Sequence, residues 1–286
     1  MRRFVPLALA TVLLLSGCGI IITDAMLKDR IREAVREDPA LVMDALDSDK
    51  VTLLHMVEQG AQERREQAMF DKWQEQLGTP FEPAIDDNRP MLGADGAPVT
   101  IVGYTDFQCG YCARGAVMVK SLIEQYPGRI RYFAKHAPMS EVGEYAARVF
   151  ESVALQSPAL AWEFYAKAFE AQSTLGQSPD PKMAYLSLAS TLVGIDAQRL
   201  GQDMESEAVK ATIREDAREF LGWGFRGVPV YLYNGVAVEG AMPRETLERV
   251  LDMVDDTQAK TQAPSPQGDA YSLDETGACT DCLSGQ

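Results

Sequence analysis

The sequence of 286 residues has only two histidines, His55 and His136. So few imidazoles argue against a histidine-rich metal site and against a histidine-based catalytic triad. Basic residues are also scarce, with 27 Lys and Arg against 42 Asp and Glu, and the net charge is -15. A chain this acidic is repelled by nucleic acid and by anionic lipid, so neither is an expected partner.

The apolar run at the N-terminus, residues 4–15, is too short to cross a bilayer as a mature helix. Two arginines precede it, as is typical of an export signal. The run ends in residues 15–18 (LSGC), which resemble the bacterial lipoprotein cleavage box. This resemblance implies cleavage after Gly17 and a lipid on Cys18. The alternative is an ordinary signal peptide with an incidental cysteine.

The residue after the cleavage box indicates which membrane would hold the lipid. In Gram-negative lipoproteins an Asp at this position resembles an inner-membrane retention signal, and Gly19 stands there instead. We therefore expect the protein at the periplasmic face of the cell envelope, anchored through Cys18, with the outer membrane favoured if the cell is Gram-negative. Disulfides persist in that compartment.

Apart from Cys18, the cysteines form two C-x-x-C pairs, Cys109/Cys112 and Cys279/Cys282. In an exported chain this spacing indicates a redox or metal motif before a structural crosslink. The second pair has no predicted strand before it and no predicted helix after it. Three interpretations of it remain open: a small disulfide in a tail, a shuttle dithiol for Cys109, or a soft-metal site shared with another chain.

The hydrophobic pattern divides the chain into six consecutive segments. They are a signal peptide (1–17), a tether (18–23), a helical arm (24–78), a linker (79–97), a body (98–256) and a flexible tail (257–286). In the arm, Leu54, Val57 and Ala61 recur at helical spacing, whereas the opposite face is charged. Because this apolar stripe is narrow, the arm is expected to pack on the body or on copies of itself.

The body combines a strand–helix–strand unit with a long helical segment. The expected elements are strands at 98–104, 130–135, 228–233 and 236–239, and helices at 113–126, 243–254 and through most of 139–222. A strand, a helix and a strand within about forty residues predict a parallel pair. Asn234-Gly235 predicts a two-residue hairpin turn. The aromatic residues of the helical segment are expected in the core.

Cys109 follows a predicted strand and stands just before an amphipathic helix. At that place the free backbone N–H groups and the helix dipole stabilise negative charge on its sulfur. Cys112 lies one turn further on, close enough to close a disulfide. Because disulfide exchange needs a thiolate, a second thiol within reach and substrate access, Cys109 is expected to be the nucleophile and Cys112 the resolving thiol.

Gly227-Val228-Pro229 precedes the last two predicted strands. In thioredoxin-like proteins the proline at this place is cis and faces the redox pair, and a cis X–Pro bond persists only where the fold enforces it. We predict that Pro229 is cis and that the Val228 backbone pairs with a substrate strand. The alternative is an ordinary proline that opens an edge strand.

Residues 105–112 (TDFQCGYC), the helical insert and residues 227–229 together resemble the DsbA family. Residues 36–46 (REDPALVMDAL) resemble the helical arm of its ScsC-like branch, some members of which oligomerise through the arm. The resemblance covers roughly residues 24–256. It implies an α/β thioredoxin-like fold with a helical insertion at 139–222, preceded by an α-helical N-terminal arm, and it implies no cofactor.

The dipeptide between the cysteines departs from the strongest oxidants of this family. Gly110 and Tyr111 replace the proline and histidine found there, and they resemble the dipeptide of periplasmic disulfide isomerases. A histidine at this place stabilises the reduced thiolate, so the disulfide of this protein is expected to be less oxidising.

Two further departures concern the surroundings of the cysteines. The family often has an acid six residues before the nucleophile, where this sequence has Gly103. Asp106 and Lys135 are therefore candidates for proton handling, with a solvated charge as the alternative for each. Val230 follows the proline where many relatives have Thr.

Two function classes follow from these features. The leading one is an enzyme that oxidises, isomerises or reduces disulfides in cysteine-containing exported proteins, with a membrane redox partner and possible self-association through the arm. The alternative is a lipoprotein that holds Cu(I) or Zn(II) with paired thiolates. Because metal capture does not require a cis-proline loop, residues 227–229 favour the enzyme. A purely structural oligomer is disfavoured by the intact Cys109, Cys112 and Pro229.

Overall fold

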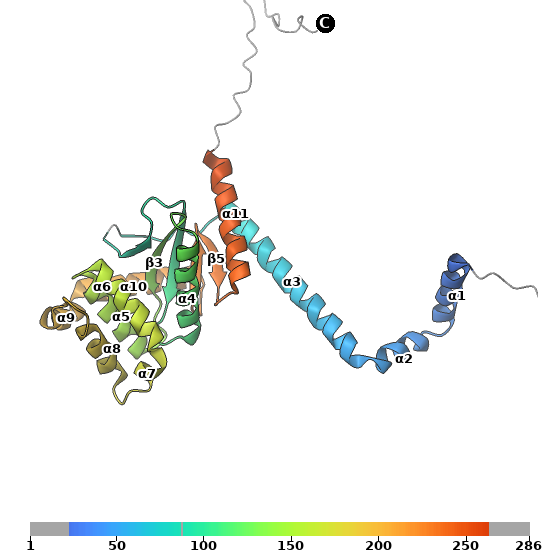
Figure 1. Cartoon of the computed structure of the whole chain (residues 1–286), viewed down its shortest axis with the longest axis horizontal. Coiled ribbons are helices and arrows are strands. Elements are labelled where there is room, and N and C mark those ends of the chain that lie inside the picture. Colours follow the sequence, from blue (N-terminus) through green and yellow to red (C-terminus); the bar gives the residue numbers. More distant parts are fainter. Residues whose placement is uncertain (1–22, 87, 263–286) are drawn as a thin grey trace, which may run out of the picture. The chain divides into compact units, whose positions relative to one another are not determined.

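The computed structural model describes residues 23–86 and 88–262. The chain falls into two compact units, Met1–Gln67 and Ala68–Gln286, and each is described by itself (Figure 1). Cys18, Cys279 and Cys282 lie outside the described residues, as do the predictions made for them.

The first unit consists of α1 (Asp24–Glu37), α2 (Ala40–Ser48) and the first part of α3 (Lys50–Gly78). The side chain of Thr23 caps α1 by accepting a hydrogen bond from the backbone N–H of Met26. Neither α1 nor α2 has a buried residue. Large apolar side chains are therefore exposed along this unit: Met26, Leu27, Ile31, Val35, Leu41, Val42, Met43, Leu46, Val51, Leu54, Met56 and Val57.

The second unit contains a five-stranded sheet in the order β1-β3-β2-β4-β5. Its strands are β1 (Met91–Gly93), β2 (Val99–Thr105), β3 (Ile130–His136), β4 (Val230–Tyr233) and β5 (Val236–Glu239). As predicted, β2 and β3 are parallel and α4 (Gly110–Gln125) connects them. The predicted hairpin turn also forms, with positive φ at Asn234 and Gly235.

The two faces of the sheet bury different side chains, because successive residues of a strand point to opposite sides. Tyr132 and Ala134 of β3 belong to the larger core, together with α4 and α11 (Arg244–Gln262). Phe133, between them, belongs to a second core that includes Tyr104 and Phe220.

The segment 139–222 is helical, as predicted, and three of its aromatic residues, Phe164, Tyr165 and Phe169, pack around Phe107 in the larger core. It forms α5 (Glu141–Ala154), α6 (Pro158–Glu170), α7 (Gln172–Gly176), α8 (Pro181–Ser190), α9 (Ala197–Met204) and α10 (Glu207–Gly222). Several of these helices begin with a capping side chain: Ser140, Ser157, Asp180, Asp196 and Ser206.

The structure differs from the expected segment boundaries in three places. The segment expected as a linker, 79–97, contains β1, which pairs antiparallel with β3 and is too short to show a periodic pattern. Helix α11 continues to Gln262, past the expected start of the tail. The division into units falls inside α3, because Trp73 is buried in the second unit, where its indole N–H donates to the Ala237 carbonyl at 2.8 Å.

Candidate active site

Cys109 and Cys112 stand at the first turn of α4, where the sequence places them. Cys109 is the N-cap of the helix, with φ -87° and ψ 116°, and it is partly exposed. Cys112 is buried one turn further on, and both are free thiols. The free backbone N–H groups of this first turn favour negative charge on the Cys109 sulfur. The pair thus combines an accessible nucleophile with a protected second thiol.

The loop before β4 lies against Cys109. The Val228–Pro229 bond is cis, as predicted. The Cys109 thiol donates to the Val228 carbonyl at 3.5 Å, across 119 residues of sequence. The fold therefore brings the two predicted halves of the site together.

Gly110 and Tyr111 form the accessible rim between the cysteines. The Tyr111 ring is 59% exposed, and the Arg114 guanidinium lies over it, 4.2 Å from the ring centroid. A β-carbon at Gly110 would have the Gln172 side-chain oxygen, 3.9 Å away, as its nearest neighbour. The dipeptide position therefore has room for other side chains.

Side chains of the helical insert hold the loop that carries the cysteines. The amide of Gln172 in α7 donates to the carbonyls of Phe107 and Cys109, at 2.8 and 3.0 Å. The Tyr185 hydroxyl of α8 also donates to the Phe107 carbonyl, at 3.0 Å. Sequence reasoning missed both residues, because nothing in their local pattern separates them from other residues of the insert.

Asp106 lies beside the redox pair and is buried rather than solvated. Its backbone N–H donates to the Cys112 sulfur at 3.5 Å. Its carboxylate accepts the backbone N–H groups of Gln108 and Met139, at 2.7 and 2.6 Å. Burial raises the pKa of this carboxyl, and the two backbone donors oppose that rise. A β-carbon at Gly143 would overlap the carboxylate, so the glycine makes room for it.

Lys135, the other candidate for proton handling, is also buried, but it lies on the opposite face of the sheet from Tyr132 and Ala134. Its ammonium donates to the Ala84 carbonyl at 2.8 Å and pairs with Asp216, at 3.2 Å, and with Glu219. The structure therefore brings Asp106 to the cysteines and assigns Lys135 to a separate charged network.

This charged network centres on Arg89, whose guanidinium binds both carboxylate oxygens of Asp216, at 2.9 and 2.6 Å. Arg89 also reaches Glu151 at 3.3 Å, and Glu151 bonds the Nε2 of His136 at 2.7 Å. Burial raises the pKa of Asp216, but Arg89 outweighs it and holds that pKa below its usual range. For Glu151, His136 and Arg89 likewise outweigh burial and lower the pKa.

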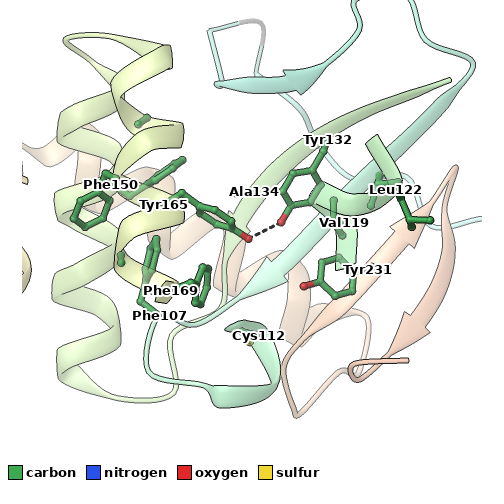
Figure 2. Close-up of a cluster of buried hydrophobic side chains, with 14 of the residues drawn as sticks. Phe107, Cys112, Val119, Leu122, Tyr132, Ala134, Phe150, Tyr165, Phe169 and Tyr231 are labelled. Carbon is green, nitrogen blue, oxygen red and sulfur yellow. Dashed lines mark hydrogen bonds between the residues drawn. The ribbon is translucent and has the colours of Figure 1, made fainter. Parts of the chain in front are cut away.

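Cys112 shares the larger core with three tyrosines: Tyr132 of β3, Tyr165 of α6 and Tyr231 of β4 (Figure 2). The hydroxyls of Tyr132 and Tyr165 share a hydrogen bond of 2.9 Å. Burial raises the pKa of all three phenols, and negative charge on Cys112 raises each of them further. Burial also raises the pKa of the Cys112 thiol. Sequence reasoning placed these aromatic residues in the core but did not connect them with the cysteines.

The strand position six residues before Cys109, Gly103, is part of this tyrosine cluster. A β-carbon at Gly103 would lie 2.5 Å from the Tyr132 hydroxyl and 2.8 Å from Cε1 of Tyr231. The rings of these two tyrosines therefore occupy the space that a side chain at position 103 would need. Within the described residues, no group of three or more His, Cys, Asp and Glu side chains is placed to hold a metal ion.

This combination of fold and redox motif is that of a thioredoxin-like protein. The Thioredoxin family profile matches residues 86–253, more than half of the chain, and the chain belongs to that family. Among solved structures, it is similar to a thioredoxin-like oxidoreductase from Silicibacter pomeroyi DSS-3, with 26% identity and a TM-score of 0.53. The match covers 60% of this chain and 94% of that one.

Two solved structures of lower sequence identity have the same fold. The thiol-disulfide exchange protein α-DsbA2 from Wolbachia pipientis is 20% identical, with a TM-score of 0.53, and the match covers 67% of this chain and 98% of that one. The catalytic domain of Proteus mirabilis ScsC is 17% identical, with a TM-score of 0.51, and the match covers 66% and 98%. The chain thus has the fold of DsbA- and ScsC-type thiol–disulfide oxidoreductases.

Curated relatives match by a part of their length. The Na⁺/H⁺ antiporter NhaA of Herminiimonas arsenicoxydans is 28% identical over 176 residues, which are 62% of this chain and 27% of that protein. The chain thus spans about a quarter of the length of such relatives. In the part of the chain that the structure describes, no helix is both long and apolar enough to cross a membrane.

Proposed function

We propose that this protein is an exported thiol–disulfide oxidoreductase that exchanges disulfides in extracytoplasmic proteins through Cys109 and Cys112. One observation carries the proposal: a partly exposed cysteine caps α4 and lies 3.5 Å from the carbonyl that precedes Pro229, with a buried thiol one turn away. The cysteines supply the electrons, so the exchange needs no further cofactor.

The exchange proceeds in two displacements. The Cys109 thiolate attacks a substrate disulfide, a mixed disulfide forms, and one substrate sulfur leaves and takes up a proton. Cys112 then attacks the Cys109 sulfur, which releases the second substrate sulfur and leaves the Cys109–Cys112 disulfide. Two electrons pass from the pair to the substrate, and the reverse sequence oxidises a substrate dithiol. The Val228 backbone holds the substrate strand beside Cys109.

The direction of exchange follows from the residues between the cysteines. Gly110 and Tyr111 place no positive charge beside the Cys109 sulfur, so the reduced pair is less stabilised than in a strong oxidant. We infer an isomerase or a moderate oxidase, kept in its working redox state by a membrane partner. Equilibration against glutathione buffers separates these roles, since an isomerase requires a pair that stays largely reduced.

An apolar groove beside the redox pair is suited to an unfolded substrate. A cavity of about 540 Å³ lies between α4 and α6, and its lining includes Ala113, Val117, Trp162 and Phe169. Ala113 directly follows Cys112, so the groove begins one residue from the site. A chain tethered to Cys109 can place an apolar side chain there.

The N-terminal signal and the helical arm determine where the protein is held and how it assembles. Residues 1–17 act as a lipoprotein signal, and the lipid on Cys18 holds the protein at the periplasmic face of a membrane. The exposed apolar side chains of α1 and α2 support self-association through the arm.

Single-cysteine variants test the exchange itself. Cys109→Ser should abolish reduction of insulin and refolding of a scrambled protein, whereas Cys112→Ser should accumulate mixed disulfides visible on non-reducing gels. Wild-type activity in Cys109→Ser would contradict the proposal.

A further inference from the structure

The hydroxyl of Tyr231 is buried and has no hydrogen-bond partner. A β-carbon at Gly115 would overlap this hydroxyl, so the hydroxyl lies against the face of α4 at Gly115. Residues three apart share a helix face, with β-carbons about 5–6 Å from each other. The hydroxyl therefore stands one helical turn from Cys112, on the same face.

The sequence makes room for this hydroxyl at a cost in stability. Gly115 and Gly103 leave the space that the Tyr231 side chain fills. A buried hydroxyl without a partner has lost its hydrogen bonds to water, whereas a phenylalanine would fill the same space without that loss. An unpaired, buried hydroxyl that stands one helical turn from a reactive thiol points to a role in the reaction.

The other polar groups around Cys112 already have partners. The hydroxyls of Tyr132 and Tyr165 bond each other. The Asp106 carboxylate accepts two backbone N–H groups, and the Cys109 thiol donates to the Val228 carbonyl. Of the hydroxyls of Tyr132, Tyr165 and Tyr231, only the last makes no hydrogen bond.

We propose that Tyr231 donates a hydrogen bond to the Cys112 sulfur while that sulfur carries the negative charge needed to attack the mixed disulfide. This inference rests on the proposed disulfide exchange. The proton of Cys112 passes to the substrate thiolate released in the first displacement, and Cys112 then attacks the Cys109 sulfur and expels the second substrate sulfur as a thiolate. Tyr231 keeps its proton throughout, because burial and the nearby cysteines raise its pKa.

Tyr233 offers a matched control in the same strand. It is buried, its hydroxyl also lacks a partner, and it points to the same side of the sheet. Burial alone raises its pKa, whereas the cysteines contribute to that of Tyr231. Tyr233→Phe therefore removes an equivalent hydroxyl away from the redox pair.

The decisive measurement separates the two displacements. In Tyr231→Phe, formation of the mixed disulfide between Cys109 and a substrate peptide should proceed at the wild-type rate, and its resolution by Cys112 should slow about three- to tenfold, the effect of one neutral hydrogen bond. Tyr233→Phe should resolve it at the wild-type rate. In a Cys109→Ser background, the Cys112 thiolate, followed by its ultraviolet absorbance, should require a higher pH in Tyr231→Phe.

The outcomes are distinguishable from a failure of the proposed function. If wild type forms and resolves the mixed disulfide but Tyr231→Phe resolves it equally fast, only the inference about Tyr231 is wrong. Equal slowing by both substitutions would also overturn it, as would a lower stability of Tyr231→Phe in urea, since the hydroxyl would then have a structural partner. If wild type forms no mixed disulfide, the proposed function itself fails.

Discussion

Gly103 of β2 and Tyr231 of β4 are register partners, and the tyrosine ring fills the space beside the glycine. The Tyr132 side chain fills the rest from β3. The absence of a side chain at position 103 is therefore a packing requirement of the tyrosine cluster. It explains why the site lacks an acid at this strand position.

Gly103→Ala should lower the free energy of unfolding by about 1–3 kcal/mol, because the new methyl group forces Tyr132 or Tyr231 to move. Urea denaturation of the reduced protein measures the change. Gly110→Ala is the control, since its β-carbon has no neighbour closer than 3.9 Å. An equal loss in both variants would show that the tyrosines do not constrain position 103.

Gln172→Ala removes both hydrogen bonds from α7 to the loop before α4 and should destabilise the protein by about 1–2 kcal/mol. Hydrogen exchange should become faster in residues 107–112. Gln177→Ala, which removes an exposed bond to Ser173, should change neither quantity. Unchanged exchange in Gln172→Ala would mean that the insert does not hold the loop.

Arg89→Met should destabilise the protein by about 3–5 kcal/mol at neutral pH, because it leaves buried carboxylates without their partner. Asp216 and Glu151 have lowered pKa values in the fold. Their contribution to stability is present above the unfolded-state pKa and is lost as the pH falls through the folded-state pKa. Without Arg89 those folded-state values rise, so acid unfolding should begin at a higher pH.

The control for Arg89 is Lys72→Met, which removes a pair with Glu239 whose side chains are about half exposed. It should cost less than about 1 kcal/mol. Circular dichroism against pH and urea measures both variants. Similar acid midpoints in Arg89→Met and wild type would contradict the electrostatic explanation.

Val117→Asp tests the groove between α4 and α6. Val117 is 62% exposed, so the substitution should leave the fold intact. It should reduce kcat/KM for an unfolded protein substrate about tenfold, as expected from losing the burial of one apolar side chain. The kcat/KM for glutathione disulfide should stay unchanged. Val193→Asp, at a position 90% exposed, is the control. An equal loss of kcat/KM with both substrates would mean that Val117→Asp disturbs the cysteines rather than the groove.

Removal of residues 24–67 tests the arm. The unlipidated protein should scatter light as an oligomer, and the truncated protein should be monomeric, since the exposed apolar side chains are lost with the arm. Oxidation of a small dithiol should survive the truncation, whereas isomerase activity should fall. A monomeric full-length protein at working concentration would exclude assembly through the arm.

Local signals predicted much of the fold. The strand–helix–strand unit, the Asn234-Gly235 turn and the helical insert each follow from patterns within a few residues. Cys109 and Pro229 could also be assigned, since each stands at a recognisable strand end. The residues that remained unpredicted depend on partners far away in sequence: β1 on β3, Gln172 on the cysteine loop, and Tyr231 on Gly103 and Gly115. The burial of Lys135 and Asp106 was harder still to predict from the sequence. A charged side chain can be buried only where the fold supplies partners for its charge, and these partners come from distant parts of the chain.

The contact between Cys109 and Val228 spans 119 residues of sequence, and the whole helical insert lies between its two ends. During synthesis the chain emerges from its N-terminus, so β2, α4 and β3 are available long before β4. Local helices of the insert form quickly, whereas the long-range pairing of β4 with β2 requires a large loop to close. Cys109 therefore acquires its contact with Val228 at a late stage of folding. A newly made chain therefore carries Cys109 and Cys112 without the Val228–Pro229 loop beside them until β4 has paired with β2.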